Sequence, residues 1–134
     1  MNAPAWIFET LKNDAQITAA IGTRIYRDVA PEAASYPFIV IQPLQAFPVE
    51  NAYSDVIMDS ERWQVKVTDK GTSYAAIRAI ASRIRALLHK QRATGIISST
   101  FASRLEYPEI SETGAKFSNV VQDFRIYTQE VTNG

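Results

Sequence analysis

Ser60-Glu-Arg-Trp-Gln-Val-Lys-Val-Thr68 alternates polar and apolar residues, and this stretch decides the fold class. Alternation with a period of two predicts a β-strand with Trp63, Val65 and Val67 on a buried face and polar side chains on a solvated or interfacial face. After a short break, apolar residues recur at spacings of three and four. That pattern predicts a long amphipathic helix from Ser73, as its N-cap, to about Arg92.

The rest of the chain supplies the partners of this strand and helix. Pro4 predicts a short helix that ends near Asn13, and Asp14 and Gly22 bound a second helical turn. Gly95 is expected to end the long helix. Further strands are predicted over residues 37–46, 96–105 and 116–131, with Pro43 at an edge or bulge, and loops over 47–59 and 107–114.

These elements predict an α+β fold in a single domain, residues 1–134. We expect a mainly antiparallel sheet of about four strands. The long helix (73–92) and the short N-terminal helical region are expected to cover one face of this sheet.

Composition excludes several classes of protein. The 134 residues contain no cysteine, which removes thiolate metal sites, cysteine nucleophiles and disulfides. Fourteen basic residues balance fourteen acidic ones, so the overall field does not recruit nucleic acid, and low net charge favours association. Residues 1–9 lack a signal-peptide pattern, and no apolar run approaches about 18 residues. We therefore expect neither secretion by signal peptide nor a membrane span.

No group of side chains has the pattern of an active site. His89 is the single histidine and is expected at the surface near the end of the long helix, where a cation complements the helix dipole. Ser98 lacks a glycine-flanked elbow. Glu106, Glu109 and Glu112 recur around a proline in a predicted exposed loop, where solvated or subunit-bridging carboxylates are favoured over a hydrolase pair or a cation site. The sequence thus predicts no catalytic, cofactor-binding or metal-binding residue, and a small hydrolase is retained only as a rival.

The predicted long helix is basic on its exposed sides and carries no acidic residue from Ser73 to Gly95. A nucleic-acid surface would pair such charge with exposed aromatic residues or a recognition motif, and neither is found here. Solvated charge, or ion pairs to a neighbouring subunit, is therefore favoured over contact with DNA. The basic residues are Arg78, Arg83, Arg85, Lys90 and Arg92.

Taken in order, these segments resemble the tail-completion or tail-terminator family of long-tailed bacteriophages over most of the chain. Each motif is weak alone, and their order and spacing together carry the resemblance. The motifs are Ile21-Gly-Thr-Arg-Ile-Tyr26, Ala30-Pro31 with Tyr36-Pro-Phe-Ile-Val-Ile41, Glu61-Arg-Trp-Gln-Val-Lys-Val67 before Ser73-Tyr74, and Glu112-Thr-Gly114 leading into Asp123-Phe-Arg-Ile-Tyr127.

The resemblance implies a structural virion protein rather than an enzyme. It implies a subunit made in the host cytoplasm that forms a hexameric ring on the head-proximal end of the tail tube, stops tube growth and offers a docking surface to the neck. The implied partners are copies of itself, the tail tube protein, head-neck connector proteins and, where the tail is contractile, a sheath or terminator partner. The viral DNA would only pass through. A head-completion or connector protein is the nearest alternative, and a nucleic-acid-binding regulator using the basic helix is the alternative from another class.

Two predicted loops supply candidate assembly contacts, because both interrupt strands and mix aromatic with charged residues. The candidates are Phe47, Tyr53 and Asp55 in the first loop, Glu109 and Glu112 in the second, and Arg78 and Arg85 on the helix.

Overall fold

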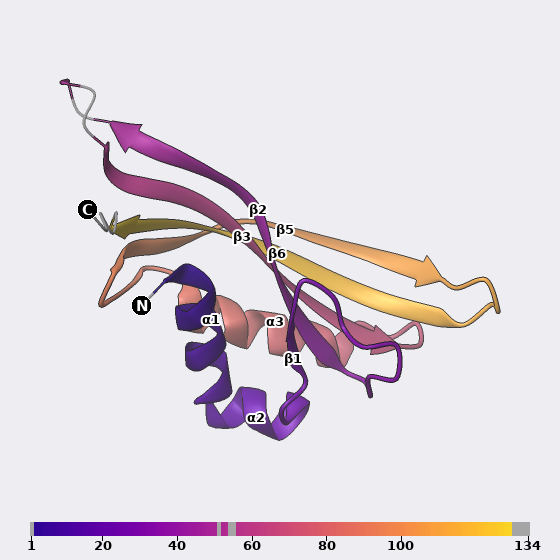
Figure 1. Cartoon of the computed structure of the whole chain (residues 1–134). Helices are drawn as coiled ribbons and strands as arrows, with labels where there is room; N and C mark the ends of the chain where they lie inside the picture. Colours follow the sequence, from indigo (N-terminus) through magenta and orange to yellow (C-terminus); the bar gives the residue numbers. More distant parts are fainter. Residues whose placement is uncertain (1, 51, 54–55, 130–134) are drawn as a thin grey trace.

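The computed structural model describes residues 2–50, 52–53 and 56–129. Three helices lie on one face of a twisted six-stranded sheet, whose strand order is β1-β2-β3-β6-β5-β4 (Figure 1). The elements are α1 (Ala3–Lys12), α2 (Ala15–Ile21), β1 (Ile25–Arg27), β2 (Phe38–Glu50), β3 (Val56–Lys70), α3 (Ala75–Leu88), β4 (Gln91–Ala93), β5 (Ile96–Ile110) and β6 (Lys116–Gln129). Among the described residues, no helix is long and apolar enough to cross a bilayer.

Two long hairpins form most of the sheet. β2 pairs with β3 from Phe38 opposite Thr68 to Glu50 opposite Val56, and β5 pairs with β6 up to Ile110 opposite Lys116. β3 and β6 join the hairpins through an antiparallel ladder, and β1 pairs in parallel with β2. The free ends of the two hairpins extend in opposite directions from the helices (Figure 1).

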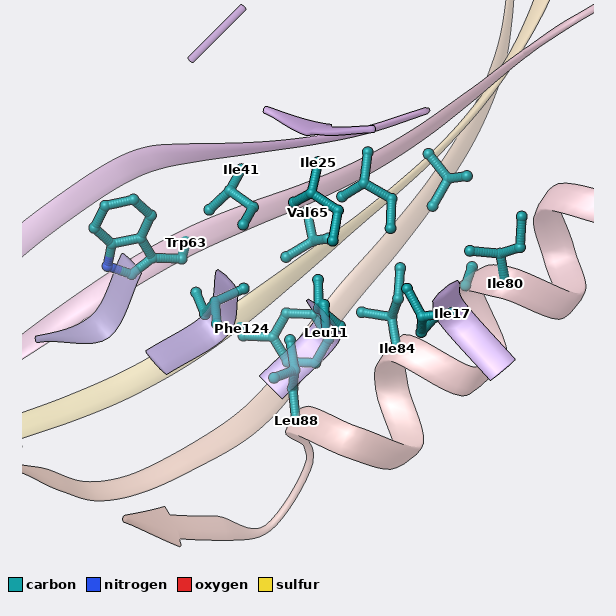
Figure 2. Packing of buried hydrophobic residues seen from close by; sticks show 14 of the residues in the cluster. Leu11, Ile17, Ile25, Ile41, Trp63, Val65, Ile80, Ile84, Leu88 and Phe124 are labelled. Carbon is teal, nitrogen blue, oxygen red and sulfur yellow. The ribbon is translucent and has the colours of Figure 1, made fainter. Parts of the chain in front are cut away.

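The core lies between the helices and the sheet. Trp63, Val65 and Val67 are buried on the helix-facing side of β3, as their alternation predicts. Their neighbours on β6 include Phe124, and α3 contributes Ile77, Ile80, Ala81, Ile84 and Leu88. Figure 2 shows side chains of this cluster directed toward one another between helix and sheet. Each large apolar side chain buried here contributes about 1.5–3 kcal/mol before entropy is subtracted.

The predicted fold class is wrong. The sheet has six strands rather than four, and it is mixed rather than antiparallel, because β1 runs parallel to β2. Three short helices form the second layer, and α3 spans 14 residues instead of the long helix predicted over 73–92. β1 and β4 are three residues each, which is too short to show alternation in the sequence. Most of the predicted loop 47–59 and half of the predicted loop 107–114 belong to strands, because β2 continues to Glu50, β3 begins at Val56 and β5 continues to Ile110.

The ends of α3 also differ from the prediction. Tyr74, not Ser73, is the N-cap, and its side chain makes no capping bond. The helix ends at Leu88, and the chain turns at Lys90, whose φ is 55°. Gly95 instead occupies the turn between β4 and β5.

The two predicted boundaries of α2 are confirmed. Asp14 is the N-cap, and its side chain accepts a hydrogen bond from the Ile17 N–H. Gly22 follows the helix with a φ of 64°, in the region where a side chain would be strained. The short α2 is therefore defined at both ends by residues whose chemistry is visible in the sequence.

Candidate assembly surfaces

The β2–β3 arm is the outer part of the first hairpin: residues 44–50 of β2, 52–53 of the turn and 56–61 of β3. Phe47 faces away from the helices, opposite Ser60, and its side chain is 50% exposed. Tyr53, in the turn, is 87% exposed, and the predicted Asp55 lies outside the described residues. Leu44 and Ile57 are further exposed large apolar residues that the sequence prediction missed. The arm therefore presents an apolar surface of the kind that marks protein contacts.

The β5–β6 hairpin holds the other two loop candidates at the opposite end of the sheet. Glu109 lies on β5 opposite Phe117 and accepts a hydrogen bond from Asn119 Nδ2 at 3.2 Å. Glu112 is exposed in the turn between the strands. Leu105 and Ile110, 62% and 68% exposed, are apolar residues of this hairpin that the sequence prediction missed. The structure thus separates the two predicted loops instead of bringing them together.

Arg78 of α3 binds a group of the same chain. It contacts Glu106 of β5, with 2.7 Å between Nη2 and Oε2, and Arg104 reaches the same carboxylate at 3.0 Å. The hydrogen bond from Arg78, reinforced by Arg104, lowers the pKa of Glu106 to about 2. Glu106 is therefore a partner of α3 rather than a solvated loop carboxylate.

Two more arginines of α3 are engaged in the same way. Arg83 forms an ion pair with Asp14, and the Arg85 guanidinium lies 4.0 Å from the centre of the Phe101 ring. The assembly candidates Arg78 and Arg85 therefore already have partners within the subunit. Three of the five basic residues considered for nucleic-acid binding thus contact side chains of the same chain. This argues against a nucleic-acid-binding regulator that uses the basic helix.

The residues considered for catalysis do not converge. His89 is half-buried rather than at the surface, and its Nδ1 accepts the Phe101 N–H at 3.0 Å. Ser98 lies on the helix-free face opposite Tyr127. In the described part of the chain, no group of three His, Cys, Asp or Glu side chains could hold a metal ion. These candidate residues therefore lie apart from one another in the described structure.

The two edges of the sheet differ in how far a neighbouring strand covers them. β1 covers β2 only from Ile39 to Ile41, so no described strand pairs with the outer edge of β2 beyond that point. Pro43 and Pro48 interrupt this edge, and the ladder shifts just after Pro43, which agrees with the predicted bulge. On the opposite edge, the short strand β4 covers only the beginning of β5. The two prolines therefore hinder uncontrolled strand addition at the β2 edge.

Comparison with known proteins identifies the family. The family model described as "Tail completion protein gp17" matches residues 5–129. The chain belongs to this family of tail completion proteins. A chain in the structure "Virion of native gene transfer agent (GTA) particle" has the same fold, with a TM-score of 0.73, 16% sequence identity and 92% of each chain covered. No curated protein matches the sequence.

Membership confirms what the sequence resemblance implied at the coarse level. A tail completion protein is a structural component of the phage virion, located in the tail. Exposed candidates such as Tyr53 were recognisable because aromatic residues in a polar, proline-containing segment stand out. Leu105 and Ile110 were not recognisable, because their exposure depends on how far β5 extends beyond the helix layer.

Proposed function

We propose that this tail completion protein forms a closed ring of six subunits at the head-proximal end of the tail tube. There the ring stops tube polymerisation and offers a docking surface to head-neck connector proteins. Its remaining partners are the tail tube protein and, in a contractile tail, a sheath or terminator component. The exposed hairpin ends at the two extremes of one sheet carry this proposal.

A ring that joins two different structures needs four surfaces on each subunit. Two different side surfaces make the head-to-tail contacts of a cyclic ring, and two end surfaces meet the tube and the neck. The sheet supplies two unlike edges, β2 and β4, for the sides. The β2–β3 arm and the β5–β6 hairpin supply two ends with exposed apolar residues, Phe47 and Tyr53 at one and Leu105 and Ile110 at the other.

The oligomeric state and the phenotype of virions lacking the protein test this function. Light scattering coupled to size exclusion, followed by imaging, should give a discrete ring, alone or after tail tubes are added. Particles made without the protein should carry tails of abnormal length. Tails of normal length beside DNA-leaking heads would instead identify a head-completion protein, and a chain that stays monomeric with tubes would contradict the ring.

The loop candidates have their own test. Alanine at Phe47 and Tyr53 should reduce incorporation into tails, because both changes remove exposed aromatic area from the arm. Alanine at Glu109 and Glu112 provides the matched change at the opposite hairpin. If both pairs leave assembly and infectivity unchanged, the hairpin ends are not the axial contacts.

A further inference from the structure

The β4 edge is the short segment 90–93 at one side of the sheet. All four of its residues are exposed, and no described residue forms an ion pair with Lys90 or Arg92. This distinguishes them from the arginines of α3, of which Arg78 and Arg83 form ion pairs within the chain. The β4 edge therefore presents two positive charges that no described carboxylate neutralises.

Lys90 holds a backbone conformation that disfavours its own side chain. Its φ of 55° lies in the left-handed region, where glycine is the usual residue after a helix end. Backbone strain of this kind clusters at functional sites. Lys90 thus combines an exposed charge with a position where glycine would be less strained.

The β2–β3 arm carries the opposite charge at the other side of the sheet. Glu50 and Asp59 form no ion pair with any described residue. Ile57, two residues from Asp59, adds exposed apolar area to the same arm. An apolar surface with carboxylates of this kind is suited to a partner surface that brings cations.

The strand register places Arg92 within one residue of the level of Asp59, whereas Lys90 and Glu50 lie on opposite sides of that level. Ala93 pairs with Ile96, Ile96 with Thr128, Thr128 with Asp59, and Asp59 with Pro48. One row of residues thus crosses the whole sheet from the β4 edge to the arm. In a closed ring all copies sit at the same height along the axis. If the row of paired residues runs perpendicular to that axis, the β4 end of the row in one copy meets the β2 end of the row in the next copy.

We propose that the β4 edge of one copy binds the side of the β2–β3 arm of the next, with Arg92 facing Asp59 and Lys90 adding its charge to the same contact with the arm that carries Glu50. Phe47 and Tyr53, on the outer face and the turn of the arm, remain the axial candidates. This inference rests on the proposed ring and assigns its side contact. Side chains rather than a continuous backbone ladder make the contact, because Pro43 and Pro48 lack the N–H groups that a ladder requires. The occupant is a second copy of this chain.

Charge reversal tests the pairing. In variant A, Lys90→Glu and Arg92→Glu make both surfaces acidic, and in variant B, Glu50→Lys and Asp59→Lys make both surfaces basic. Each variant alone should need a roughly tenfold or higher concentration to form rings, because like charges then meet at every contact. An equimolar mixture of A and B should restore rings, since alternating copies place opposite charges at every contact when the ring order is even.

A matched control separates this contact from a general charge effect. Lys70→Glu with Lys116→Glu changes the net charge as variant A does, at the exposed far end of β3 and β6, and should leave ring formation unchanged. Thermal unfolding of each monomer checks folding. If variant A and variant B each form rings by themselves at the wild-type concentration, or if mixing A with B does not restore rings, the pairing is wrong. The proposed function still stands in either case, provided that the wild type forms rings. Absence of rings in the wild type, with and without tubes, overturns both.

Discussion

Arg83 of α3 holds the carboxylate that caps α2. Asp14 Oδ2 accepts the Ile17 N–H at 3.0 Å, and Arg83 Nη2 lies 2.6 Å from Asp14 Oδ1. The Arg83 hydrogen bond lowers the pKa of Asp14, which keeps the carboxylate ionised as cap and ion-pair partner. The Asp14 side chain thereby caps the N-terminus of α2 and also connects α2 to α3 through an ion pair.

Substitutions at Asp14 should separate these two roles. Asp14→Asn keeps an oxygen for the Ile17 N–H but removes the charge, whereas Asp14→Ala removes both interactions. We expect alanine to reduce the free energy of unfolding by about 1 kcal/mol more than asparagine, the typical value of an N-cap. Urea unfolding measures both variants. Equal losses would mean that the cap contributes nothing.

The ion pairs of Glu106 should make stability depend on acid pH. Its pKa is about 2 in the folded protein against an ordinary value of 4.5, so the unfolded chain binds the proton first. The stabilisation is complete above pH 4.5 and is lost as the pH falls through that value toward 2. Denaturant unfolding over this window should show a shallower loss in Glu106→Gln than in the wild type. Parallel curves would contradict the prediction.

Gln122 is a polar residue in the centre of the core. Its Nε2 donates to the Ala81 carbonyl oxygen at 2.7 Å, whereas its buried Oε1 has no hydrogen-bond partner among the described residues. Gln122→Met keeps the volume and removes the unsatisfied oxygen, so we expect it to be neutral or to stabilise by about 1 kcal/mol. Gln122→Ala opens a cavity and should cost about 2–4 kcal/mol. A methionine variant as unstable as the alanine one would show that the bond to α3 dominates.

Lys90→Gly should separate folding from assembly. Glycine relieves the left-handed conformation, and we expect the monomer to gain about 0.5–1 kcal/mol in thermal or chemical unfolding. Ring formation should weaken, because a cation is lost from the β4 edge. Arg92→Gly is the control: it removes the neighbouring cation at a residue without positive φ, and it should not stabilise the monomer. If Lys90→Gly destabilises the monomer, the backbone there is not strained.

Side chains that repeat at a clear period were predictable from the sequence. Trp63, Val65 and Val67 indicate β3, and the apolar stripe of α3 ends at Leu88 in the expected spacing. β1 and β4 were not predictable, because three residues held by tertiary pairing carry no period. The lengths of β2 and β5 were missed because prolines, such as Pro48 and Pro108, are typical of loops but lie within these strands.

The candidate surfaces were predictable only in part. Tyr53 and Glu112 stand out as residues of hairpin turns, and both are exposed. Arg78 and Arg85 suggested outward-facing charge, yet Glu106 and Phe101 lie close enough in space to engage them. Such contacts join residues far apart in the chain, so no local pattern reveals them.

The prolines on the outer edge of β2 affect whether separate copies of the protein can associate through this strand. A bare strand edge accepts almost any extended chain and grows without a defined end. Pro43 and Pro48 withhold two donors along the stretch where a foreign strand would add. Separate copies of the protein are therefore less able to add to one another through this edge of the sheet.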